Sequence, residues 1–220
     1  MKTPLTAERL RQHLRYGWWK YVLSLALILS LSSILFTMTA PRPAEDQKIE
    51  MLVYGATRED ALNAYLEWVR QERFPEQELF SASVYTDAAS GIAGMATRIF
   101  AGDGDIFLLP EDTFKGYADQ GILLPLDSVP EVMDALQAYG IPTDRGNALG
   151  PDGQPYLFGI SVTRLPVMES WLVDRSVDRY LCVRVRNGND ETTKRLLIQM
   201  LKDLHSLDGM VIPESITASP

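Results

Sequence analysis

The sequence predicts an α/β domain with a single doubly wound sheet, preceded by one N-terminal transmembrane helix. Two observations support this fold class. Residues 21–40 form an apolar run of 20 residues without a charged side chain, and residues 48–121 alternate three times between a short apolar stretch and a helical pattern. Strand–helix units in succession are typical of a parallel sheet with helices on both faces.

The apolar run is long enough to cross a membrane. A helix rises about 1.5 Å per residue, so 20 residues span about 30 Å, the thickness of the hydrocarbon core. Five bases and a single acid precede the run, and the adjacent residues Trp18 and Trp19 suit an interfacial aromatic belt. Because basic flanks stay inside, we expect residues 1–20 to form a basic cytoplasmic tail. The protein is then a single-pass protein of the cell membrane, with its domain outside.

A cleaved signal peptide is the alternative. Apolar regions of signal peptides are usually about 7–15 residues long and end in small residues at the cleavage site. Here the run is longer, Met38-Thr39-Ala40 matches a cleavage site poorly, and no cysteine lies nearby for lipid attachment. An uncleaved anchor is therefore the favoured interpretation.

Charge divides at the anchor. Residues 1–40 hold five of the 21 Lys and Arg and one of the 29 Asp and Glu, which leaves 16 bases and 28 acids, a formal charge of −12, beyond it. Neutralising phosphates requires basic side chains, so nucleic acid is excluded as a partner. Cys182 is the sole cysteine, so no intramolecular disulfide can form, and its apolar neighbours predict a buried thiol in a strand.

The chain beyond the anchor divides into a linker at 41–47, a folded domain at 48–207 and a flexible tail at 208–220. Strands are expected at 48–55, 79–85, 105–109, 156–163 and 179–186, helices at 57–73, 91–101, 110–121, 131–139 and 191–205, and a hairpin turn at 147–154. A Ser/Thr-x-x-acid pattern from Thr57 to Asp60 predicts a capping box for the first of these helices.

Doubly wound sheets bind ligands where the carboxyl ends of their strands meet. The loops that follow the first three strands, at 55–57, 86–90 and 109–112, therefore supply the candidate binding residues. These are Tyr54, Gly55, Thr57, Thr86, Asp87, Ser90, Pro110, Glu111 and Asp112.

Two stretches resemble the extracellular solute-binding proteins of bacterial ABC sugar importers. In residues 98–127 a helix ends in Ala-Gly-Asp-Gly, Asp105-Ile-Phe-Leu-Leu-Pro begins a strand, and Gln120-Gly leads to Leu-Leu-Pro-Leu-Asp127. Residues 152–160, Asp-Gly-Gln-Pro-Tyr-Leu-Phe-Gly-Ile, are similar to the family's strand that enters the interlobe hinge. The resemblance implies lobe 1 of a periplasmic binding protein, a sugar or other small solute as ligand, and an importer or sensor as membrane partner.

The resemblance also adds Tyr156 to the candidate binding residues. Aromatic side chains stack on sugar rings in that family, so Tyr54, Tyr85 and Tyr156 could do so here. Each also lies in or at the end of an apolar strand, where packing in the core is the other interpretation.

The chain departs from the family after the hinge-like strand. Only 17 residues, 164–180, separate that strand from the next, so most or all of a second lobe is absent. A single lobe buries less of a small ligand. The alternative function is therefore a degenerate lobe that serves as a structural or protein-interaction domain at the cell surface. Trp171, within the short connection, could be an exposed anchor or could cover the sheet edge.

Signatures of catalysis, metal binding and cofactor binding are missing from the sequence. The two histidines, His13 and His205, lie far apart, and neither has a second ligand pattern beside it. Ser90 has no candidate base and fits a helix N-cap, and acids such as Glu111 are explained by a helix N-terminus. Residues 103–105 lack the further oxygens of a calcium loop, so a plain turn is expected. We predict a protein that is not an enzyme.

Overall fold

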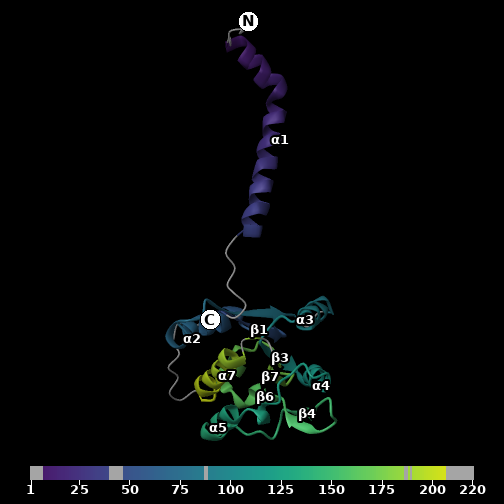
Figure 1. Ribbon diagram of the computed structural model, residues 1–220, viewed down its shortest axis with the longest axis vertical. Coiled ribbons are helices and arrows are strands. Elements are labelled where there is room, and N and C mark those ends of the chain that lie inside the picture. The colour runs from purple at the N-terminus through teal and green to yellow at the C-terminus, as the bar shows by residue number, and fades with distance from the viewer. Residues whose placement is uncertain (1–6, 40–46, 87–88, 186–187, 189, 207–220) are drawn as a thin grey trace. The chain divides into compact units, whose positions relative to one another are not determined.

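The computed structural model describes residues 7–39, 47–86, 89–185, 188 and 190–206 (Figure 1). The chain divides into two compact units, Met1–Arg42 and Pro43–Pro220. Residues 1–6 of the expected tail, nearly all of the expected linker 41–47, the expected tail 208–220 and the candidate residue Asp87 lie outside the described residues.

The first unit contains one helix, α1, which spans Ala7–Thr39. It begins well before the predicted start at Tyr21, because residues 7–16 are rich in the helix formers Ala, Leu, Arg and Gln. Pro41 disfavours a helical residue before it, which accounts for the end at Thr39. Residues 17–36 of α1 are apolar and long enough to cross a membrane, and signal sequences share these properties.

The second unit is built on a five-stranded mixed sheet in the order β2-β1-β3-β7-β6. The strands are β1 (Lys48–Tyr54), β2 (Leu79–Tyr85), β3 (Ile106–Pro110), β6 (Gly159–Ser161) and β7 (Arg179–Val183). β1 pairs in parallel with β2 and with β3, as predicted, while β7 is antiparallel to both of its neighbours. The α/β class is confirmed, and the departure from an all-parallel sheet is confined to β7.

The direction of β7 follows from the path of the chain. After β6, residues 162–178 form a crossing segment that contains α6 (Pro166–Trp171) and a short 3-10 turn, Val162–Arg164. The chain re-enters the sheet at the same end of the strands at which β6 left it, so β7 must run in the opposite direction to β6. A parallel strand would need a crossover that returns to the other end.

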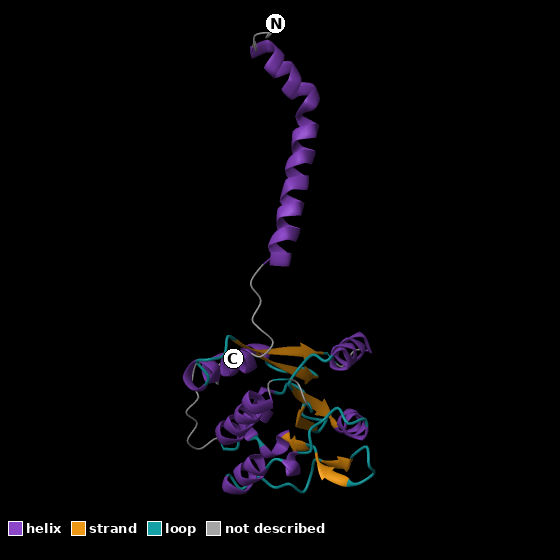
Figure 2. Ribbon diagram, viewed as in Figure 1, coloured by secondary structure: helices purple, strands orange, loops and turns teal. Residues whose placement is uncertain are grey.

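Helices cover both faces of the sheet (Figures 1 and 2). One face packs against α2 (Glu59–Arg73), α5 (Pro130–Ala138), α6 and α7 (Asp190–Leu204), and the other against α3 (Ala89–Ala101) and α4 (Glu111–Asp119). Alternation along β1 divides the core: Met51 and Val53 join the first cluster of buried side chains, and Leu52 joins the second. The domain is therefore doubly wound, as predicted.

Several local predictions need correction. The strand expected at 156–163 is two strands, β5 (Pro155–Leu157) and β6, and β5 pairs with β4 (Asn147–Leu149) in the expected hairpin. Thr57 does not cap α2, because the N-cap residue is Arg58 and the Thr57 hydroxyl bonds to the Gly55 carbonyl instead. Ser90 is the second residue of α3 rather than its N-cap.

Candidate functional site

The loop that follows β1 is covered by the crossing segment. Thr57 pairs with Leu172 in an antiparallel bridge. On either side of it, the Arg58 amide donates to the Trp171 carbonyl at 2.8 Å and the Val173 amide donates to the Ala56 carbonyl at 3.1 Å. These backbone bonds occupy part of the edge where the sequence placed a ligand.

Two buried side chains of the crossing segment and of β7 complete this cover. Trp171 is 1% exposed and its ring lies 5.4 Å from that of Tyr65 on α2, so it is a core residue. Arg179 is 2% exposed and donates from Nη1 to the Asp174 carbonyl at 2.6 Å. Its guanidinium lies against Gly55, whose φ of +86° and close contact leave no room for a Cβ. Gly55 therefore allows the arginine to lie over the end of β1.

The other candidate residues of this edge are dispersed. Tyr54 is half-buried and packs against the second cluster, while Thr86 and Ser90 are exposed. At the end of β3, Pro110 is half-buried, Asp112 is exposed, and Glu111 lines a pocket of about 370 Å³. The edge is thus closed over β1 and open beside β3.

The pocket beside β3 is polar, and its charges are paired with one another. Glu111 forms an ion pair with Lys115 at 2.5 Å, and Asp178 forms one with Arg145 at 3.0 Å. A solute would have to displace these internal partners, which makes this pocket less favourable for binding a solute.

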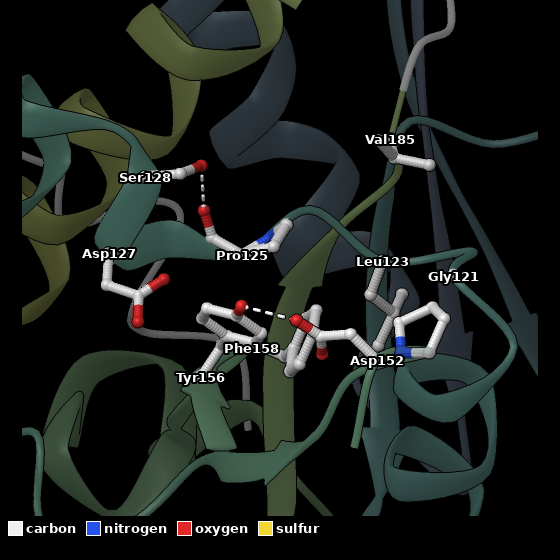
Figure 3. A pocket seen from close by; sticks show the side chains of 10 residues that line it. Gly121, Leu123, Pro125, Asp127, Ser128, Asp152, Tyr156, Phe158 and Val185 are labelled. Atoms are coloured by element: carbon white, nitrogen blue, oxygen red, sulfur yellow. Dashed lines mark hydrogen bonds between the residues drawn. The ribbon is translucent and has the colours of Figure 1, made fainter. Parts of the chain in front are cut away.

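A pocket of about 670 Å³, larger than the one beside β3, lies at the opposite edge of the sheet. It reaches Val185, just beyond β7, where the neighbouring Arg184 amide donates to the carbonyl of Asp105 at the start of β3. Tyr156 is the single predicted binding residue in its lining. Figure 3 shows this pocket, which is lined by Gly121, Leu123, Pro125, Asp127, Ser128, Pro151, Asp152, Tyr156, Phe158 and Val185.

Two carboxylates lie on either side of the Tyr156 ring (Figure 3). The Tyr156 hydroxyl donates to Asp152 at 2.7 Å, and Asp127 accepts the amide of Leu157 at 3.3 Å. The hydrogen bond to Asp152 raises the pKa of Tyr156, and the charges of Asp152 and Asp127 raise it further. The same bond, with the Gln154 amide, lowers the pKa of Asp152. Both acids therefore act on the same ring.

This arrangement suits the binding of a small molecule. Tyr156 and Phe158 meet edge to face at 6.1 Å, and Leu123, Val185 and the prolines complete an apolar floor. Such a floor with a few convergent polar groups is typical of small-molecule sites. The hydroxyl of Ser128 donates to the Pro125 carbonyl at 2.6 Å, and within the described residues no group of three or more metal-ligating side chains occurs.

Asp127, Asp152 and Phe158 line this pocket and were not among the candidate residues predicted from the sequence. All three fall within the two stretches that carry the family resemblance, but those stretches indicated a turn and a hinge strand rather than a binding site. The pocket forms only because residues 121–128 and 151–158 are brought together at one edge.

The other predicted features lie outside both pockets. Residues 102–105 form a turn between α3 and β3, as predicted, and Gly104 has a φ of +81°. Beside it, Asp105 accepts a hydrogen bond from the Glu50 amide at 2.6 Å, and Arg98 forms an ion pair with Asp103 at 3.0 Å. Cys182 is fully buried in β7, as predicted, and burial raises the pKa of its thiol.

No protein-family model matches the chain, and no curated protein matches it. Solved structures are similar over about half of it. They include an extracellular solute-binding protein of family 1 from Alicyclobacillus acidocaldarius, at 15% identity over 55% of this chain with a TM-score of 0.37. An uncharacterized protein of Listeria monocytogenes matches 52% of this chain at 12% identity, with a TM-score of 0.41. An ABC substrate-binding protein of the same species, in complex with cycloalternan, matches 52% at 24% identity, with a TM-score of 0.38. In each case this chain spans 28% of the length of the other protein.

Proposed function

We propose that this protein is a membrane-anchored, non-catalytic binding module for small solutes outside the cell membrane. The apolar stretch of α1 supports the anchor, and the excess of bases before it supports a cytoplasmic N-terminus. The observation that carries the binding role is the pocket of about 670 Å³ in which the two carboxylates flank the Tyr156 ring.

A sugar or similar polyhydroxylated solute fits the lining of this pocket. Carboxylate oxygens accept hydrogen bonds from hydroxyl groups, and those to charged groups are the stronger ones. The half-exposed ring of Tyr156 offers an apolar face to the C–H side of a sugar ring. Residues 48–160 also resemble sugar-importer binding proteins, so we place the module beside a carbohydrate importer or a sensor.

Isothermal titration of the full chain in nanodiscs against a panel of sugars and oligosaccharides tests this proposal. We expect one or more members to bind, and Tyr156→Ala to weaken that binding about threefold to tenfold through loss of the ring contact. Glu111→Gln, in the smaller pocket, is the matched control and should leave binding unchanged. The proposed site is refuted if no sugar of the panel binds, or if the wild type, Tyr156→Ala and Glu111→Gln bind with equal affinity.

The second candidate is a structural or protein-interaction domain. The observation that favours it is the crossing segment, which closes the sheet edge over β1 and presents Val173, 68% exposed, at the surface. This function predicts that the purified chain captures a defined membrane protein, that Val173→Asp abolishes capture, and that no sugar shifts its melting temperature. Capture unaffected by Val173→Asp would argue against this surface.

A further inference from the structure

We propose that the solute recognised at the large pocket carries a positively charged amino group, and that the pocket prefers amino sugars to neutral sugars. This inference rests on the proposed function, because it assumes that a small solute binds between Asp127, Asp152 and Tyr156. It adds the charge of that solute.

The lining of the pocket is negatively charged. Asp127 and Asp152 carry two negative charges, and none of the described residues that line the pocket is Lys, Arg or His. A neutral solute would leave both charges uncompensated as it displaced water from them. A solute with an ammonium group would supply the missing positive charge.

The acids of the large pocket differ from those around the smaller pocket. Around the smaller pocket, Glu111, Asp144 and Asp178 each form an ion pair with a Lys or Arg, at 2.5, 2.8 and 3.0 Å. Among the described ion pairs, none involves Asp127 or Asp152. The acids of the large pocket are held by neutral donors, a tyrosine hydroxyl and backbone amides, and keep their charge available.

The aromatic ring of Tyr156 lies between the two acids (Figure 3). A cation within about 6 Å of a ring face is attracted by the ring's quadrupole, and Tyr156 is placed to provide that face. The hydrogen bond from Tyr156 fixes the Asp152 carboxylate and holds its pKa below the usual range, so Asp152 stays ionised at neutral pH. The face of the Tyr156 ring and the carboxylates of Asp152 and Asp127 together favour an ammonium group on a ring-shaped solute.

Two disaccharides of nearly the same shape provide the test. The β-1,4-linked glucosamine dimer and cellobiose differ in having an amine or a hydroxyl at one position of each ring. We expect isothermal titration of the full chain in nanodiscs at pH 6 and low salt to show about tenfold tighter binding of the glucosamine dimer, from two exposed charge contacts. The preference should shrink at high salt, which screens exposed charges.

Nearly isosteric variants locate the preference. Asp127→Asn and Asp152→Asn should each reduce the preference about threefold, and the double variant should abolish it, because the glucosamine dimer loses a charge contact that cellobiose does not make. Glu111→Gln removes one acid from the smaller pocket and should have no effect. This control matters because residues beyond the anchor carry a formal charge of −12, which attracts any cation weakly.

The outcomes separate the two proposals. Equal affinity for the two disaccharides overturns the inference about the amine and leaves the solute-binding function in place. A preference that survives in the double variant also overturns the inference about the amine, because residues other than Asp127 and Asp152 then recognise the positive charge. If neither disaccharide binds and the wider sugar panel is silent as well, the proposed function fails and this inference with it.

Discussion

Replacing Trp171 with alanine tests whether the crossing segment is part of the core. An aromatic side chain buries about 150–250 Å², and Trp171 is 1% exposed, so nearly all of that area leaves water on folding. At about 25 cal/mol per Å² this is about 4–6 kcal/mol. The indole Nε1 has no hydrogen-bond partner among the described residues, which lowers the net value. We expect Trp171→Ala to cost about 3–5 kcal/mol.

The assay is denaturation by urea of the full chain in a mild detergent, followed by far-ultraviolet circular dichroism. Domains of this size are stable by about 5–15 kcal/mol, so the variant should lose a large fraction of its stability. Trp171→Phe is the first control: it keeps a ring beside Tyr65 and removes the unpaired N–H, so it should cost about 1–2 kcal/mol. Val173→Ala, two residues on and exposed, should change stability by less than about 0.5 kcal/mol.

A loss below about 1 kcal/mol for Trp171→Ala would refute the reasoning. The crossing segment would then be a loosely attached loop, and the edge over β1 would be available to a ligand after all. Equal losses for Trp171→Ala and Val173→Ala would have the same meaning.

Three further predictions concern other parts of the domain. Gly55→Ala should cost about 1–3 kcal/mol in the same assay, because the new Cβ meets the Arg179 guanidinium at a positive φ; wild-type stability would contradict the close approach. The Cys182 thiol should resist maleimide up to pH 9, since burial raises its pKa, and react once urea unfolds the domain; fast labelling of the folded protein would contradict its burial. Glu50→Gln should lower the stability of the domain by about 1–3 kcal/mol, because the nearly buried Glu50 carboxylate forms an ion pair with Arg98 at 2.7 Å. Unchanged stability would mean that the ion pair with Asp103 is enough to hold Arg98.

Much of the fold follows from local pattern. Alternating apolar runs and helical spacings predicted β1, β2 and β3, each followed by its helix, and their parallel pairing. The hairpin β4–β5 followed from a cluster of glycine and proline between two short strands. The boundaries shifted by a few residues at most in these elements, because the signal is strongest in their middles.

The candidate site was less predictable. Topology rules placed it at the carboxyl ends of the parallel strands, but at β1 backbone bonds from residues 171–173 cover that edge. The large pocket lies at the other edge and contains one predicted residue, Tyr156. Sequence spacing could not join Asp127 to Asp152, because their proximity depends on how the hairpin β4–β5 packs beside the loop that follows α4.

The sequence by itself determined the α/β class, the three strand–helix units, an apolar helix long enough for a membrane, and the burial of Cys182. These depend on hydrophobic periodicity and length, which are local properties of the chain. Only the tertiary structure decided the direction of β7, the burial of Trp171 and Arg179 over the first strand, and the meeting of two carboxylates at Tyr156. Those depend on contacts between residues far apart in sequence, and no local pattern encodes which distant segment comes to lie against which edge of the sheet.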